Sequence, residues 1–286
     1  MKKKFVALTA LVAALPVFLA ACGSSSSSTK TTTVKIGVIG SDADVWKPVA
    51  KRLKKQNINL KLVEFTDYNK PNQALLDGDI DLNAFQTIQF LDNWNKAHKS
   101  NIANVGNTYI GPVRLYSQKV KKLSALKKDA KVAIANDQTN EARALELLQQ
   151  AGLIKLNPDK TFPTTRDITS NKLNLNITPV DASQTARSLT SVDAAVVNND
   201  IALNAKLKPS SAIYVEKITK ASKPFVNVVA ATNKNKNNKV YKKVVKAYQN
   251  EATKKVIKKV YNGSTELHGT CPLSSQYCLS EDHRPA

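Results

Sequence analysis

Short apolar runs alternate with stretches of helical periodicity over the first part of the chain. The amphipathic stretches repeat apolar residues every three or four positions, Pro71 suits the first turn of a helix, Gly40 follows the first predicted strand and Gly78 ends the second predicted helix. The pattern predicts a strand at 34–39, a helix at 45–53, a strand at 60–65, a helix at 71–78 and a strand at 80–85. This order is typical of an α/β fold with a mainly parallel sheet between helices.

The same alternation returns after residue 130. It predicts strands at 131–135, 177–180, 194–197, 213–215 and 225–231, a helix at 140–151, and one long helix with an apolar stripe at 239–260. Two α/β units of similar size, between which the chain crosses more than once, indicate two lobes around a cleft. The predicted lobe I covers 34–112 plus 223–262, and the predicted lobe II covers 113–222.

The N-terminal residues have the pattern of an export signal and a tether. Three lysines precede an apolar run at 5–19, which is shorter than the about 20 residues of a spanning helix. Small residues then lead to Cys22, the arrangement that a lipoprotein signal peptidase cuts. We expect a signal peptide at 1–21, diacylglycerol and palmitate on Cys22, a flexible linker at 22–33, and anchoring on the extracytoplasmic face of the cell membrane. The alternative is an ordinary secretory signal in which Cys22 is incidental.

The formal net charge of +21 at pH 7 falls to about +18 once the three lysines of the leader are removed. The lysines are scattered over predicted helix faces and loops, and they follow no recognised nucleic-acid-binding motif. This distribution favours a solvated lysine surface that faces an anionic envelope over a nucleic-acid partner.

The search for catalytic motifs finds no nucleophile elbow, phosphate loop, metalloprotease helix or dinucleotide fingerprint. His98 lies beside lysines, as a solvated surface residue does. Asp77, Asp79 and Asp81 alternate around Gly78, but no bidentate acid follows at the spacing of an EF-hand. The sequence therefore predicts neither cofactor nor metal site, and an enzyme is the weaker class.

Several specific segments resemble one known family. They are FTDYNKPNQAL at 65–75, GDIDLNAFQ at 78–86, VGNTY at 105–109, NDQTN at 136–140 with Arg143, GLIKL at 152–156, KPFVN at 223–227 and YQ at 248–249. Over roughly 34–263 the chain is similar to the methionine-binding lipoproteins of the NlpA type.

The resemblance implies a substrate-binding protein of an ABC importer with a two-lobed, type II periplasmic-binding-protein-like fold. Such a protein closes on an amino acid, here L- and D-methionine, and hands it to a membrane permease driven by a cytoplasmic ATPase. The positions that match the family's binding residues are Tyr68, Phe85, Asn140, Arg143, Asn198 and Asn227.

The chemistry of the polar positions suits an amino acid, although each has a structural alternative. Arg143, predicted in the first turn of a helix, would bind a carboxylate, or else pair with Glu141 or Glu146. Asn198 ends a strand where clefts of α/β sheets bind ligands, or else serves a turn. Asn227 interrupts an apolar run and is expected to be buried, with ligand or neighbouring backbone as its partner.

The aromatic positions suit a thioether, and two nearby residues depart from the family pattern. Tyr68 and Phe85 would wall the ligand side chain, unless they belong to the core. Many methionine-binding members have His and Tyr where this chain has Thr87 and Phe90, which we expect to line the site with fewer polar contacts. Methionine is the first expected ligand, and a methionine-containing dipeptide or another amino acid is the alternative. A surface adhesin is a further one.

The last residues differ in composition from the rest of the chain. After residue 263 there is no lysine, whereas two of the three cysteines and two of the three histidines occur there. Cys271 and Cys278 could form a disulfide, and with His268 and His283 they could suggest zinc, but the spacing matches no common zinc module. We predict a disordered tail at 263–286.

Overall fold

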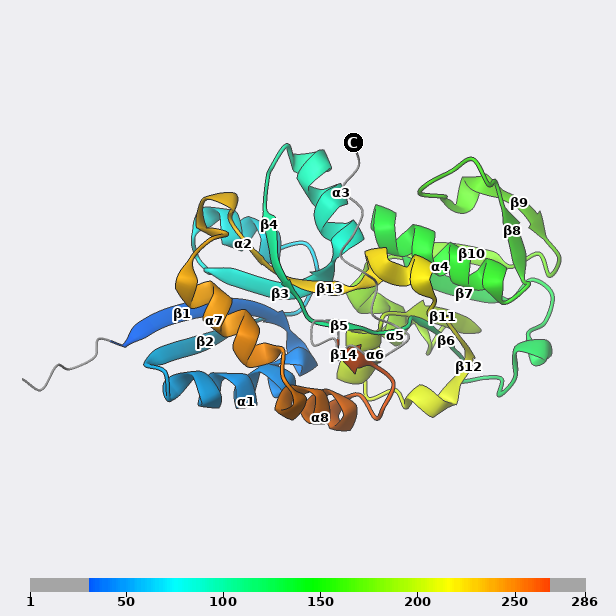
Figure 1. Ribbon diagram of the computed structural model, residues 1–286. Coiled ribbons are helices and arrows are strands. Elements are labelled where there is room, and N and C mark those ends of the chain that lie inside the picture. Colours follow the sequence, from blue (N-terminus) through cyan, green and yellow to red (C-terminus); the bar gives the residue numbers. More distant parts are fainter. Residues whose placement is uncertain (1–30, 268–286) are drawn as a thin grey trace, which may run out of the picture. The chain divides into compact units, whose positions relative to one another are not determined.

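Two five-stranded sheets organise residues 31–267, the part of the chain that the computed structural model describes (Figure 1). Sheet I, in the order β2-β1-β3-β13-β4, consists of β1 (Thr32–Ile39), β2 (Ile58–Phe65), β3 (Leu82–Thr87), β4 (Ala103–Asn107) and β13 (Asn227–Ala231). β1 pairs in parallel with β2 and β3, and β13 runs antiparallel to β3 and β4. Four strands therefore share one direction, in agreement with the predicted mainly parallel sheet.

Helices cover both faces of sheet I. One face carries α1 (Ala43–Lys54), α7 (Lys239–Tyr248) and α8 (Glu251–Val260), and the other carries α2 (Pro71–Asp77) and α3 (Ile88–His98). The core on the first face includes Trp46 packed against Tyr248, with ring centroids 4.5 Å apart and the rings tilted by 36°. The second includes Leu75, Leu91 and Trp94. The apolar faces of these amphipathic helices therefore pack against both faces of sheet I.

Sheet II repeats the design in the order β10-β7-β11-β6-β12. Its strands are β6 (Arg114–Tyr116), β7 (Lys131–Ala135), β10 (Asn176–Val180), β11 (Ala194–Val197) and β12 (Ala212–Val215), and only β6 runs against the others. α4 (Gln138–Gln150) packs on one face, and α5 (Thr185–Ser188) and α6 (Asn199–Asn204) pack on the other. A small hairpin of β8 (Ile154–Leu156) and β9 (Ile168–Asn171) adjoins α4.

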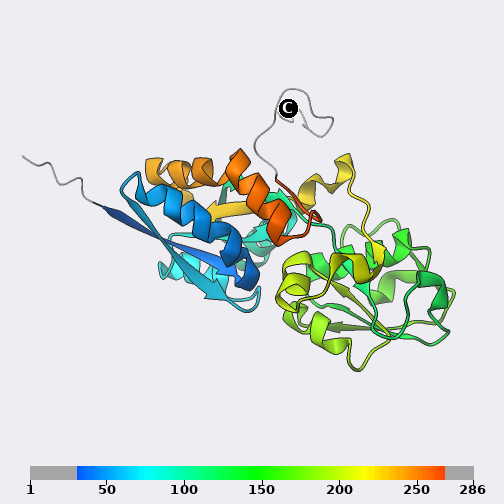
Figure 2. The same ribbon diagram turned by 90° about the horizontal axis from the view of Figure 1, so that it is seen from below.

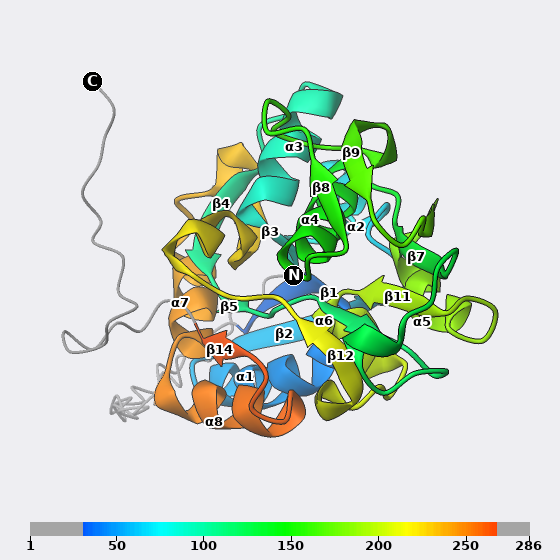
Figure 3. The same ribbon diagram turned by 90° about the vertical axis from the view of Figure 1, so that its right-hand side faces the viewer.

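The chain crosses between the sheets twice. The first crossing runs from β4 through β5 (Tyr109–Ile110) to β6, and the second runs from β12 to β13 through a 3-10 helix, Lys220–Phe225. β14 (Glu266–Leu267) pairs antiparallel with β5, beside which it lies in Figure 3. The first residues of the predicted tail therefore belong to the fold. The predicted signal peptide, Cys22 and the four tail residues discussed above lie outside the described residues.

The predicted long helix at 239–260 is wrong as a single element. The helix breaks at Gln249 and Asn250, where α7 ends and α8 begins. The Asn250 side chain accepts a hydrogen bond from the Thr253 N–H and donates one to the Ala247 carbonyl, while Gln249 donates to the Asn107 carbonyl at 2.7 Å. An N-cap of this kind satisfies a free N–H group at the start of α8, which outweighs continued helical periodicity.

Apolar and polar contacts join the two sheets. One core cluster combines Ile39, Tyr68 and Phe85 of lobe I with Ala133 and Val197 of sheet II. Beside it, the Ser41 N–H donates to Oδ1 of Asn204 at 2.6 Å. The two lobes are therefore in contact. None of the helices in the described range is long and apolar enough to span a membrane.

We expect Gly106→Ala to lower the free energy of unfolding by about 1–3 kcal/mol, the usual range for overpacking a core. A Cβ on Gly106 in β4 would overlap Cγ1 of Val245 in α7, and a β-branched side chain cannot swing aside. Denaturant unfolding measures the change. Adding Val245→Ala should give a double variant that loses less than the sum of the two single changes, and strict additivity would contradict this steric account.

Candidate functional site

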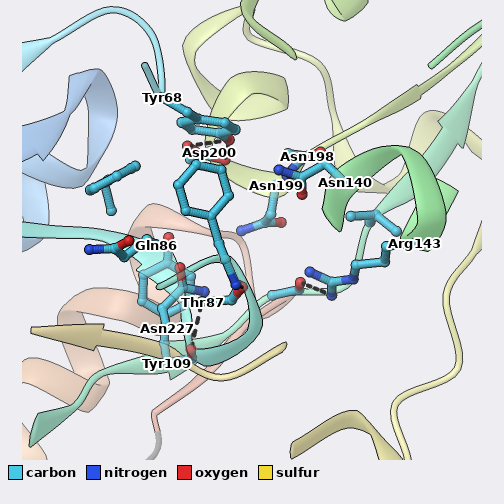
Figure 4. Close-up of a pocket in the computed structure, with 14 residues that line it drawn as sticks. Tyr68, Gln86, Thr87, Tyr109, Asn140, Arg143, Asn198, Asn199, Asp200 and Asn227 are labelled. Atoms are coloured by element: carbon cyan, nitrogen blue, oxygen red, sulfur yellow. Dashed lines mark hydrogen bonds between the residues drawn. The ribbon is translucent and has the colours of Figure 1, made fainter. Parts of the chain in front are cut away.

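A cavity lies between the two sheets, at the ends of several of their strands (Figure 4). It is lined by Tyr68, Phe85, Gln86, Thr87, Phe90, Tyr109, Gly111, Val113, Asn140, Arg143, Asn198, Asn199, Asp200 and Asn227. Its volume is about 30 Å³, room for about two water molecules. The lobes are thus nearly closed on each other around a small polar and aromatic space.

Three aromatic rings form one wall of the cavity. Tyr68, Phe85 and Phe90 lie with ring centroids 5.7 to 6.2 Å apart, and Phe90 meets both of the others edge to face. The Tyr68 hydroxyl donates to the carboxylate of Asp200, 2.7 and 2.8 Å from its two oxygens. The wall is therefore apolar on its surface and anchored to the opposite lobe at its edge.

Arg143 forms the cationic side of the cavity from the second turn of α4. Its Nε and Nη2 donate to the two carboxylate oxygens of Glu216, at 2.9 and 2.6 Å, and Nη2 also donates to the Gly111 carbonyl at 3.0 Å. The Phe225 ring lies 4.2 Å from the guanidinium carbon. Nη1 makes no hydrogen bond to any described residue, so it is available to an anion in the cavity.

Glu216 is itself held by the first crossing. It is only 6% exposed and accepts a hydrogen bond from the Val113 N–H at 3.0 Å. The pair with Arg143 is buried on both sides, with side chains 5% and 3% exposed. A buried ion pair is tolerated where hydrogen bonds compensate the lost hydration, and here the Val113 N–H and the Gly111 carbonyl supply such bonds.

Amide side chains line the rest of the cavity. Asp137 caps α4 and accepts from Asn140, whose Oδ1 in turn accepts from Nδ2 of Asn198 at 2.8 Å. Asn227 donates to the Tyr109 carbonyl at 3.4 Å. The side-chain Oδ1 atoms of Asn198 and Asn227 have no hydrogen-bond donor among residues 31–267, which leaves them free to accept from a ligand.

Thr87 has a local role as well as a place in the lining. Its hydroxyl oxygen accepts from the Phe90 N–H at 3.1 Å and caps the start of α3. The hydroxyl proton remains free to donate into the cavity.

Two buried carboxyl groups lie at the junction of the lobes. Asp200 lines the cavity, and Asp42 receives hydrogen bonds from the hydroxyls of Tyr109 and Tyr261. Burial raises the pKa of Asp42 well above its usual range, and the charge of Asp200 raises it further, against the hydrogen bond from Tyr109. Burial likewise raises the pKa of Asp200, and the Tyr68 hydrogen bond opposes that shift.

The structure brings all the ligand residues proposed from the sequence to this one cavity: Tyr68, Phe85, Thr87, Phe90, Asn140, Arg143, Asn198 and Asn227. Two details differ. Arg143 lies in the second turn rather than the first, and its ionic partner is Glu216 rather than Glu141 or Glu146. Asn227 is half-buried rather than buried, because it begins β13 at the cavity edge instead of lying within the strand.

Sequence reasoning missed Glu216 and Asp200. Glu216 follows directly on a predicted strand, and Asp200 lies two positions after Asn198, so each was adjacent to a recognised feature. The hydrophobic periodicity of the sequence marks neither position, because the partners of these side chains, Arg143 for Glu216 and Tyr68 for Asp200, are distant in the chain.

Comparison with known proteins places this geometry in a family. The family model for NlpA lipoprotein matches residues 34–267, which includes every residue of the cavity. The chain belongs to the NlpA lipoprotein family. As in the rest of this family, the chain is a substrate-binding component of a transporter and not an enzyme.

Several relatives of similar sequence carry methionine in their names, and one was solved with methionine bound. The D-methionine-binding lipoprotein MetQ of Salmonella typhi is 39% identical over 269 residues, 91% of this chain and 96% of that protein. The substrate-binding protein of a methionine transporter from Streptococcus pneumoniae is 42% identical, with a TM-score of 0.78 over 82% of this chain and 95% of that one. A nutrient-binding protein from Burkholderia cenocepacia, solved with bound methionine, is 42% identical, with a TM-score of 0.79 over 82% and 100%.

Asp42→Asn should stabilise this NlpA protein more at pH 8 than at pH 5. Because the pKa of Asp42 is higher when folded than when unfolded, its contribution to the free energy of unfolding falls as pH rises from the ordinary carboxyl range through the raised pKa. Asparagine removes that ionisation. Melting temperatures at both pH values measure the difference, with exposed Asp44→Asn as the control. An equal effect at both pH values would contradict the buried-carboxyl account.

Glu216→Gln should lower the free energy of unfolding by about 3–5 kcal/mol, because it leaves the Arg143 guanidinium buried without a counter-charge. The double variant Arg143→Gln, Glu216→Gln keeps donors and acceptors for the neighbouring backbone groups and removes both charges. We expect it to lose less than the single variant in urea unfolding. A double variant that is less stable than Glu216→Gln would show that the ion pair itself supplies the stability.

Proposed function

We propose that this chain captures methionine between its lobes and delivers it to the membrane permease of an ABC importer, whose cytoplasmic ATPase drives transport. A lipid anchor on Cys22 would hold it at the extracytoplasmic face of the membrane. Membership of the NlpA family and the methionine in the names of several relatives support this proposal. The observation that carries it is the free Nη1 of Arg143, a fixed cation in a cavity with unpaired amide oxygens.

An α-amino acid fits these groups by charge. Its carboxylate would bind Nη1 of Arg143, since Glu216 already holds the other edge of the guanidinium. Its ammonium would donate to the side-chain Oδ1 atoms of Asn198 and Asn227, and Asn140 would hold Asn198 in orientation.

The aromatic wall favours a soft, uncharged side chain. Sulfur–aromatic contacts contribute about 0.3–1.5 kcal/mol, and Tyr68, Phe85 and Phe90 offer three rings. Asp200 beside this wall would disfavour an acidic side chain through the cost of a second buried negative charge. We therefore place methionine ahead of acidic amino acids.

Binding requires the lobes to move. A cavity of about 30 Å³ has room for water but not for methionine, so the ligand must enter a more open arrangement. The crossings beside Gly111 and Glu216 are the segments about which lobe II would rotate, and the Ser41–Asn204 and Tyr68–Asp200 contacts would separate. Ligand contacts from both lobes would then favour closure.

A methionine-containing dipeptide is the second candidate ligand. Thr87 and Phe90 supply fewer polar groups than the His and Tyr of many relatives, and a second residue of a peptide could use the Thr87 hydroxyl proton. A surface adhesin is the less favoured reading, because it has no need of the Arg143 site.

Calorimetry separates these readings. The chain from Gly23 to Ala286 lacks the lipidated cysteine and keeps every described element. We expect L-methionine to bind with micromolar or tighter affinity, and D-methionine, other amino acids and Gly-Met give the specificity series. Tighter binding of Gly-Met than of methionine would favour the dipeptide, and no heat with any ligand would refute the proposal.

The double variant Arg143→Gln, Glu216→Gln should weaken methionine binding about ten- to a hundredfold, the loss expected for a charge-assisted hydrogen bond. Glu146→Gln is the matched control on the same helix, since Glu146 does not line the cavity. If the double variant binds methionine as tightly as the control does, Arg143 is not a ligand-binding residue. Loss of affinity in both variants would point to α4 as a whole.

A further inference from the structure

One side of lobe I holds nearly all of that lobe's excess positive charge. α1, α7 and α8 contain eleven lysines and one arginine against two acids, Asp44 and Glu251. The rest of residues 31–112 and 223–267 has nine basic and eight acidic residues. Both acids on the helices already pair with lysines three positions away. The asymmetry is therefore a property of these three helices.

The three helices form one continuous surface. Arg52 of α1 donates to the Ala247 carbonyl at 2.9 Å and to the Thr253 hydroxyl, and so ties α1 to the ends of α7 and α8. Figure 2 shows α1 in blue directly beside α7 and α8 in orange. All eleven lysines of these helices are exposed, whereas the aromatic residues Trp46, Tyr241 and Tyr248 are buried. We call these lysines the basic face.

The chain enters lobe I at the edge of the basic face. The Thr32 N–H donates to the Asn57 carbonyl at 2.9 Å, three residues after the last residue of α1. Thr32 follows Cys22 by ten positions, and a linker of the flexible kind expected from the sequence would have at that length a root-mean-square reach of about 17 Å. A membrane that holds Cys22 would thus lie close to the lysines at the end of α1.

We propose that the basic face docks on the anionic lipid headgroups of the membrane that holds the anchor. Lysine is a compact point charge that is attracted by a negative surface without needing a defined partner geometry. Tethering keeps the face within a short distance of the headgroups, where the attraction is least screened. A nucleic-acid site would instead present aromatic rings or a cluster of arginines among its cations, and the basic face has neither.

Docking through this face leaves the ligand site free. No residue of α1, α7 or α8 lines the cavity, and lobe II is attached only through the crossings and the lobe contacts. The inference rests on the proposed anchor for its choice of membrane and does not depend on methionine as the ligand.

Vesicle flotation tests the docking with the chain from Gly23 to Ala286, which carries no acyl group. We expect it to bind phosphatidylcholine vesicles that contain 30% phosphatidylglycerol and not to bind vesicles of pure phosphatidylcholine. The bound protein should dissociate as the salt concentration is raised. The variant Lys242→Gln, Lys246→Gln, Lys255→Gln, Lys259→Gln should partition at least tenfold less to the anionic vesicles.

The matched control removes the same charge from lobe II. It is Lys121→Gln, Lys122→Gln, Lys127→Gln, Lys128→Gln, four residues that are also exposed. We expect its partitioning to stay within twofold of the unsubstituted chain, and both variants to give unchanged calorimetry with methionine.

Three results would overturn the proposal. Equal loss in both variants would mean that net charge and not the basic face sets binding. No preference for anionic vesicles would mean that the face does not dock on lipid. Binding to soluble polyphosphate in place of vesicles would assign the face to another polyanion. If methionine gives no heat while the vesicle results hold, the ligand proposal fails and the docking proposal stands.

Discussion

The buried ion pair of Arg143 and Glu216 is the interaction on which the arrangement of the two lobes depends. Glu216 belongs to the second crossing and accepts from Val113 of the first, while Arg143 donates to Gly111 of the first. Two segments that are distant in sequence are therefore held by one pair of charges. Removing both groups from water is expensive, and the pair persists because backbone and side-chain hydrogen bonds surround it. The same contacts fix the guanidinium with its free edge toward the cavity.

That pair also explains why the fold was easier to predict than the site. β7 and β11 contain unbroken apolar runs, β1 has an apolar run interrupted by Lys35, and Pro71 and Gly78 mark the ends of α2 through their own backbone preferences. Such signals are local. The partner of Arg143 is not local, since it lies 73 positions away and becomes adjacent only when both crossings are in place. The sequence instead offered Glu141 and Glu146, which are close to Arg143 along the same helix, although only Glu146 lies at the i, i+3 spacing of facing residues.

The resemblance to a family supplied the cavity residues where periodicity could not. Tyr68 and Phe85 look like core residues in the sequence, and they are indeed buried members of a core cluster that spans both sheets. They line the cavity as well, because the core and the site are continuous here. The helix break at Asn250 was missed for a different reason: asparagine is tolerated in a helix pattern, and only its capping bonds to Ala247 and Thr253 show that it starts a new one.

The basic face of lobe I lies apart from the ligand cavity, and this separation determines how docking on a membrane would affect closure of the lobes. A ligand shifts an equilibrium only by its difference in affinity for the two states. Contacts made by the basic face involve the exposed lysines of α1, α7 and α8, and the core beneath these helices consists of lobe I residues except for Leu203 of α6 at its margin. Docking through them would therefore favour neither the open nor the closed arrangement. It would hold lobe I still while lobe II moves, so that closure depends on the contacts between the lobes, such as those of Tyr68 with Asp200, together with ligand contacts such as those of Arg143 and Asn198.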